Sequence, residues 1–112
     1  MSGEGTHQQL SRLLAKLVAE LQHQQLWQAE SPSAQALAST EPFCVDTLSF
    51  SQWLQWVMIP RFEQMVAAEM PLPPRCEIQP MAEEGLKDLG AAGRKLIALV
   101  GEIDRTLTVA HH

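Results

Sequence analysis

The sequence predicts an all-α protein, a small bundle of three long helices plus one short helix. Apolar residues recur every three or four positions near both ends of the 112-residue chain, as on one face of a helix. A central stretch, residues 49–66, is apolar on nearly every side, which is typical of a helix in the middle of a bundle. No stretch alternates polar and apolar residues long enough for a β-strand, and no internal repeat occurs.

The first long helix is predicted to run from Thr6 to about Trp27. Thr6 followed by Gln9 matches a capping box, the pairing of an N-cap hydroxyl with a glutamine three residues later. Residues 1–5 are predicted to be a disordered N-terminus. The apolar positions of this helix are Leu10, Leu13, Leu14, Leu17, Val18 and Leu21, followed by Leu26.

A short helix and an ordered loop are predicted next. Ser31 is a suitable N-cap and Pro32 a suitable first residue for a short alanine-rich helix over residues 33–38. Such a helix is too short to be stable alone, so we expect it to pack on the rest of the domain. Residues 39–47 are predicted to form an ordered loop, because Phe43 and its apolar neighbours need burial.

The central helix is predicted to begin at Ser49, with Gln52 completing a second capping box. Pro60 lacks an amide hydrogen and crowds the carbonyl of Trp56, so we expect a kink there. At 100° per residue, Arg61 projects near the middle of the apolar face. A guanidinium in that place must be paired, reach solvent or line a cavity. The favoured interpretation is a structural ion pair with Asp46, Glu83 or Asp104.

The last helical region is predicted to open near Pro80, after the proline-rich segment 71–74. A break is expected near Gly90, because glycine weakens a helix, with a stronger segment continuing to about Leu107. Residues 6–108 are then one domain, and residues 109–112 a loose tail. The apolar positions with three- and four-residue spacing are Leu86, Leu89, Gly93, Leu96, Val100, Ile103 and Leu107. This seam suits an intramolecular bundle as well as a homodimer.

The charge of the chain favours a protein partner over a nucleic acid. The formal net charge is −5 and the sequence pI is about 5.2, whereas binding to a phosphate backbone needs a basic patch. No lysine or arginine occurs between Lys16 and Arg61. We therefore expect an unknown protein partner, or self-association, at the middle of the chain.

No catalytic, cofactor-binding or metal-binding pattern is present, so we expect a protein that is not an enzyme. The two cysteines, Cys44 and Cys76, lie far apart in sequence without histidines at ligand spacing, and are expected to be free thiols. The chain has no signal peptide and no apolar run of membrane length, which predicts a cytoplasmic protein without a membrane partner.

The tryptophans of the central helix suggest where a partner binds. Core packing is the favoured role of Trp53, whereas Trp56 is suited equally to core packing and to partner contact. Together with the preceding loop they define a candidate interaction surface: Phe43, Asp46, Thr47, Trp53, Trp56, Ile59, Pro60 and Arg61.

Five segments of the chain together resemble the YqcC-like family of small bacterial proteins. They are HQQLW (23–27), STEPF with Asp46 and Thr47 (39–47), WLQWVMIPR (53–61), PLP (71–73) and PMAE (80–83). The resemblance implies a compact all-helical domain from a proteobacterium. Members are associated with no known activity, so no catalytic residues carry over. In some bacteria members are encoded beside a tRNA pseudouridine synthase, which suggests a link to RNA modification.

Two alternatives to a protein-interaction module stay open. An accessory factor of RNA modification could use Arg61, Arg75, Arg94 and Lys95 with an exposed tryptophan, although the acidity of the chain counts against it. A small-molecule pocket could be lined by Trp53, Arg61 and Asp46. The loop around Phe43 is expected to lie against the central helix, with Asp46 or Thr47 satisfying Arg61 or the carbonyl of Trp56.

Overall fold

The computed structural model describes residues 5–73 and 76–109, and within these ranges the regular structure is helical without β-strands. The expectations for residues 1–4, Arg75 and residues 110–112 lie outside the described residues. In chain order the elements are α1 (Thr6–His23), α2 (Ala34–Leu37), η1 (Pro42–Cys44), α3 (Phe50–Trp53), η2 (Leu54–Met58), α4 (Ile59–Ala67), α5 (Gln79–Gly85), η3 (Lys87–Leu89) and α6 (Ala91–Val109).

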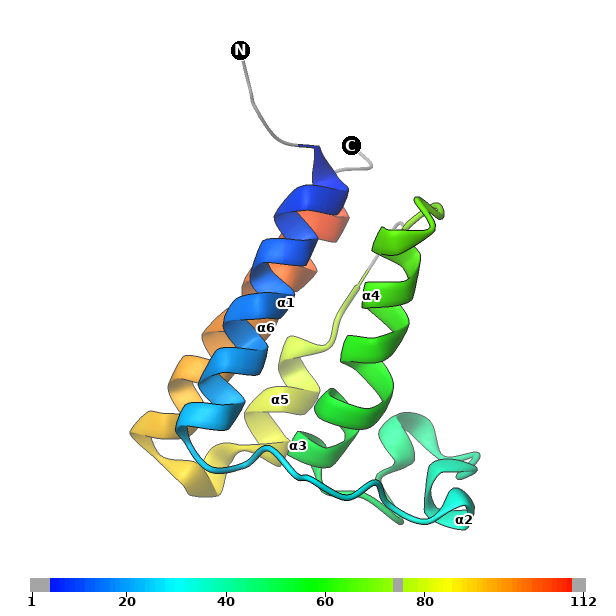
Figure 1. Cartoon of the computed structure of the whole chain (residues 1–112). Helices are drawn as coiled ribbons and strands as arrows, with labels where there is room; N and C mark the ends of the chain where they lie inside the picture. The colour runs from blue at the N-terminus through cyan, green and yellow to red at the C-terminus, as the bar shows by residue number, and fades with distance from the viewer. Residues whose placement is uncertain (1–4, 74–75, 110–112) are drawn as a thin grey trace.

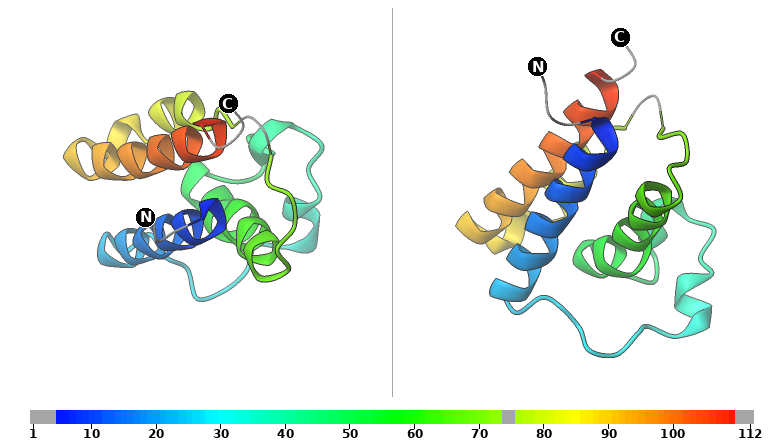
Figure 2. Two further views of the ribbon diagram at one scale, coloured as in Figure 1. Left: turned by 90° about the horizontal axis from the view of Figure 1, so that it is seen from above. Right: turned by 45° about the horizontal axis from the view of Figure 1, so that its top comes forward.

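The two longest helices, α1 and α6, lie side by side and run in opposite directions (Figure 1). Helix α4 packs against α1, α5 packs against α6, and α3 packs against α5. Seen from above, α1 and α6 occupy the left side of the molecule and α4 the right side (Figure 2). The bundle therefore has two different faces, one made by α1 and α6 and the other by α4 and its neighbours.

A single core lies between these helices, and it confirms the predicted all-α bundle. The C-terminal seam is used inside the chain, because Leu96, Val100, Ile103 and Leu107 are fully buried without a second copy. Each such side chain contributes about 1.5–3 kcal/mol relative to exposure. The other principal core residues are Leu10, Leu14, Leu17 and Leu21 of α1, and Leu54, Met58, Ile59 and Phe62 of the central helix.

Two of the predicted N-caps are wrong. Helix α1 begins after Gly5, whose position carries no side-chain cap, and Thr6 is already inside the helix. The cap of α2 is Ser33 instead of Ser31, because the Ser33 hydroxyl accepts the Ala36 N–H at 3.1 Å. In both cases several neighbouring polar residues could cap a helix, and tertiary packing selects among them.

Helix α1 ends at His23, four residues earlier than predicted. Gln25 adopts a left-handed conformation with φ 62°, and the Leu26 N–H donates to the Leu21 carbonyl at 2.9 Å. This is a Schellman motif, which satisfies the last free carbonyls of a helix and is normally built on glycine. Helix α4 ends in the same way at Glu69, with φ 52°.

The central helix begins as predicted. The Gln52 N–H donates to the Ser49 hydroxyl at 3.3 Å, and the Gln52 side chain accepts the Ser49 N–H at 2.8 Å, which completes the capping box. The helix then contains a π-helical turn, η2, immediately before Pro60, where the Ile59 N–H donates to the Leu54 carbonyl. The irregularity expected at Pro60 is therefore a widened turn, in which one extra residue is accommodated.

The last helical region is broken near Gly90, as predicted. Gly90 has φ 62°, a conformation that suits glycine, and it separates η3 from α6. Gly93 serves a different purpose, because a Cβ at that position would lie 2.4 Å from the carbonyl oxygen of Leu86. Its missing side chain lets the first turn of α6 approach the preceding backbone closely.

Candidate functional site

A hollow of about 330 Å³ lies between the central helix and the extended segment that precedes α5. We call it the aromatic groove. It is lined by Phe43, Trp53, Val57, Met58, Arg61, Phe62, Met65, Pro73, Cys76, Glu77 and Ile78. Its floor is buried and apolar, whereas its charged side chains, Arg61 and Glu77, are exposed at the rim.

Three aromatic rings support one wall of the groove. The ring of Phe43 meets that of Trp53 edge-on, with centroids 4.8 Å apart and planes at 63°, and Trp53 lies 5.7 Å from Phe50. Phe43 has φ 58°, an unfavourable conformation for a residue other than glycine. Aromatic packing offsets this cost. The structure therefore brings Phe43 and Trp53 together, as expected for the loop and the central helix.

Arg61 is exposed at the rim of the groove, and none of its three predicted ion-pair partners bonds to it within the described part of the chain. Asp46 accepts a hydrogen bond from the Ser39 hydroxyl, and the Thr47 hydroxyl donates to the Ala36 carbonyl at 2.7 Å. These two side chains fasten the loop to itself and to α2. Of the three residues predicted to line a pocket, Trp53 and Arg61 line the aromatic groove and Asp46 does not.

The remaining predicted surface residues point elsewhere. Ile59 is a core residue with 2% of its surface exposed, and Pro60 is exposed. Trp56 is half-buried, and its indole N–H donates to the side-chain oxygen of Gln28 at 3.2 Å. Trp56 thus faces the linker between α1 and α2. The predicted surface is divided between this linker side and the aromatic groove.

The linker is held by a buried glutamine that the sequence analysis did not single out. The side chain of Gln55 donates to the Gln28 carbonyl at 2.7 Å and accepts the Gln28 N–H at 2.8 Å. Gln55 is only 4% exposed, so its amide needs partners. A glutamine inside an otherwise apolar helix was the signal available in the sequence.

A second buried polar residue fixes the far wall of the groove. Asp104 of α6 accepts the Ile78 N–H at 3.0 Å and the Gln79 N–H at 2.7 Å. These amides lie at the start of α5, where a negative charge stabilises the helix end. Asp104 is 9% exposed and belongs to the core, which excludes it as a partner of Arg61.

Cys76 lies in the same wall, where its surroundings favour the protonated thiol. Burial, together with a hydrogen bond to Asp104 and the charge of that carboxylate, raises the pKa of Cys76 to about 12. Its thiol therefore stays protonated near neutral pH, and a protonated thiol is a poor nucleophile. Cys44, the other cysteine, is also a free thiol and is buried.

The chemistry of the groove is suited to binding. Within residues 5–73 and 76–109 no three histidine, cysteine, aspartate or glutamate side chains are placed to hold a metal ion. Nor does any helix of that portion have the length and apolarity to span a bilayer. The described residues of the groove offer apolar contact area, aromatic rings and the exposed guanidinium of Arg61.

Comparison with known proteins shows two similar bacterial chains. An uncharacterized protein of Haemophilus influenzae is 38% identical over 92 residues, which cover 82% of this chain and 87% of the relative. The uncharacterized protein YqcC of Escherichia coli is 36% identical over 81 residues, 72% of this chain and 74% of the relative. The solution NMR structure of YqcC matches with a TM-score of 0.82 at 30% identity, over 94% of this chain and 90% of that structure.

A third relative has a very different length. The tRNA pseudouridine synthase C of Pectobacterium carotovorum is 37% identical over 65 residues, which are 58% of this chain but only 17% of the synthase. The family model described as "tRNA pseudouridine synthase C" (DUF446) matches residues 9–106. The fold and these sequence similarities agree with the resemblance stated from the residues, and the chain belongs to the YqcC-like DUF446 family.

Proposed function

We propose that this protein is a non-catalytic accessory domain that binds a tRNA pseudouridine synthase through the aromatic groove. The observation that carries the proposal is the match to a small part of a longer chain named tRNA pseudouridine synthase C. The Haemophilus influenzae and Escherichia coli relatives match over 87% and 74% of their own length, so the matching region makes up most of each relative. A region that is part of an enzyme chain in one bacterium and most of a protein in others is expected to contact that enzyme in each of them. The complex would act on tRNA in the cytoplasm.

The geometry supports the aromatic groove as the contact surface. Tryptophan, phenylalanine, methionine and arginine are enriched at protein interfaces, and all four types line the groove. The half-buried Trp53 and Met65 offer apolar area, and the exposed Arg61 offers five N–H donors. The complementary segment of the synthase would be apolar with a carboxylate opposite Arg61.

The test is an isothermal calorimetric titration of the purified chain with the tRNA pseudouridine synthase C of the same bacterium. Arg61→Ala should weaken binding by about tenfold or more, equivalent to about 1.4 kcal/mol. Gln64→Ala is the matched control, because Gln64 is also exposed on α4 but lies outside the groove. Adding the wild-type chain should also raise the rate of pseudouridine formation on tRNA.

Two results would contradict the proposal. One is the absence of measurable heat or co-purification between the wild-type chain and the synthase. The other is an equal loss of affinity in Arg61→Ala and Gln64→Ala, which would move the contact away from the groove. Sedimentation of the chain alone tests the other predicted occupant, a second copy, since a dimer that Arg61→Ala dissociates would assign the groove to self-association.

A further inference from the structure

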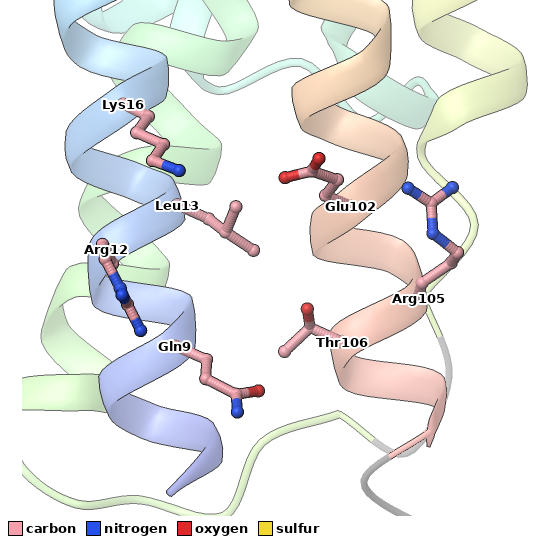
Figure 3. A pocket seen from close by; sticks show the side chains of 7 residues that line it. All are labelled: Gln9, Arg12, Leu13, Lys16, Glu102, Arg105 and Thr106. Carbon is pink, nitrogen blue, oxygen red and sulfur yellow. The ribbon is translucent and has the colours of Figure 1, made fainter. Parts of the chain in front are cut away.

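Four of the eight lysines and arginines line hollows between α1 and α6, on the side of the molecule away from α4 (Figure 2). A hollow of about 320 Å³ on this face is lined by Arg12 and Lys16 of α1 and by Glu102 and Arg105 of α6. Figure 3 shows Glu102 on the side of α6 that faces α1, with Arg105 at the outer edge of the same helix. A neighbouring hollow adds Lys95. We call these four residues, Arg12, Lys16, Lys95 and Arg105, the basic seam.

The basic seam differs in sign from the rest of the chain. It holds four of the eight lysines and arginines, and the carboxylates lining its hollows are Glu20 and Glu102. The remainder of the sequence carries four cations against eleven carboxylates. The net charge of −5 therefore hides an uneven distribution of charge along the chain, and the overall acidity does not describe the basic seam.

We propose that the basic seam binds the phosphate backbone of RNA, which under the proposed function is the tRNA of the partner synthase. Lys95 and Arg105 are ten residues apart, or about 15 Å along α6, enough to reach several phosphates of one strand. Gln9 and Thr106 line the same hollow and supply further polar groups for phosphate and sugar (Figure 3). This site reads charge and shape without contacting base edges.

The position of the basic seam allows the enzyme and the RNA to bind at the same time. Helices α1 and α6 form one side of the molecule, whereas α4, which carries Arg61, lies on the other (Figure 2). A domain of this kind holds the enzyme on one face and guides the backbone of its substrate on the other. It raises the affinity of the complex for tRNA through two linked contacts.

The test mixes the chain alone with a fluorescently labelled, unmodified tRNA transcript. Binding is measured as the fluorescence anisotropy of the transcript at several salt concentrations. Binding should weaken as salt rises, with a log–log slope of about −2 to −3.6 for three to four neutralised phosphates. Lys16→Gln should weaken binding about three- to tenfold, whereas Lys87→Gln, outside the seam, should change it less than twofold. Both residues are exposed lysines, so the two substitutions change net charge equally.

A second matched pair reverses the sign of the effect. Glu102→Gln removes a carboxylate from the hollow and should tighten binding about three- to tenfold. Glu63→Gln on α4 changes net charge by the same amount and should leave binding within about twofold of wild type. A dependence on position within each pair cannot arise from net charge alone.

Three results would overturn the proposal: no binding to the transcript at about 25 mM KCl, equal effects within each pair, or poly-glutamate competing as strongly as RNA of equal charge. The last result would assign the seam to an acidic protein surface. The synthase is absent from this assay, and its own binding is measured with Arg61→Ala, so the failure of one proposal is distinguishable from the failure of the other. Unchanged far-ultraviolet circular dichroism melts confirm that each variant folds.

Discussion

Replacing Asp104 with asparagine should destabilise the protein more than any other Asp→Asn or Glu→Gln substitution among the described residues. The carboxylate accepts two backbone N–H groups, from Ile78 and Gln79, with Oδ1 and Oδ2 respectively. In Asp104→Asn one of these oxygens becomes an NH₂ donor, which cannot accept a hydrogen bond. One buried N–H at the start of α5 is then left without an acceptor.

The expected loss is about 2 kcal/mol. A hydrogen bond to a charged group contributes about 1.5–3 kcal/mol. The charge near the N-terminus of α5 adds about 0.3–1 kcal/mol. Relief of the cost of burying a charge, at a residue 9% exposed, offsets part of both. For a chain of 112 residues this loss lowers Tm by about 8 °C.

Urea unfolding followed by tryptophan fluorescence measures the free energy, and amide hydrogen exchange locates the effect. Exchange at Ile78 and Gln79 should accelerate more than exchange in α1. Asp88→Asn is the control, because Asp88 is exposed in η3 and should change stability by less than about 0.5 kcal/mol. If Asp104→Asn and Asp88→Asn have the same stability, the two N–H bonds do not hold α5 in place, and the reasoning is refuted.

Three further predictions concern other parts of the fold. Gln25→Gly should raise the free energy of unfolding by about 0.5–1 kcal/mol, since glycine suits φ 62°, whereas Ala15→Gly in the exposed middle of α1 should lower it by about 1 kcal/mol. Gly93→Ala should lower stability by about 1–3 kcal/mol despite the better helix propensity of alanine, because its Cβ would lie 2.4 Å from the Leu86 oxygen; a gain in Tm would contradict this. The folded pKa of Cys76, about 12, exceeds the ordinary value of 9.0, so the unfolded state releases this proton first. The contribution of the protonated Cys76 thiol to the free energy of unfolding is therefore complete below pH 9 and is lost as pH rises towards 12. The urea midpoints of wild type and Cys76→Ala should converge or cross over that pH range. A difference between the two midpoints that stays constant with pH would refute this prediction.

The parts of the fold that the sequence predicts well are determined by neighbouring residues. The capping box of Ser49 and Gln52 needs residues three positions apart, and the break at Gly90 needs one residue that tolerates positive φ. The apolar spacing from Gly93 to Leu107 likewise describes the buried face of α6, whereas Leu89, before the break, is exposed. These features are encoded locally, and the structure contains them where they were expected.

The parts that the sequence does not predict depend on distant contacts. Asp104 caps a helix that begins 25 residues earlier, and Gln55 binds the backbone of Gln28, 27 residues before it. The end of α1 at His23 is missed for another reason, because Gln25, the left-handed residue that follows the helix, is not glycine and gives no local signal. Only a three-dimensional arrangement shows that these polar residues have partners.

The position of Arg61 depends on the π-helical turn and links the fold to the proposed function. A regular helix from Ser49 places Arg61 in the apolar face, but the extra residue within η2 rotates every later side chain by about 100°. Ile59 and Phe62 then enter the core while Arg61 reaches the rim of the aromatic groove. Pro60 favours this turn because it has no N–H to bond with the Trp56 carbonyl. The segment that most resembles the family therefore positions Arg61, the exposed cation of the groove among the described residues, and Pro60 inside this helix contributes to that position.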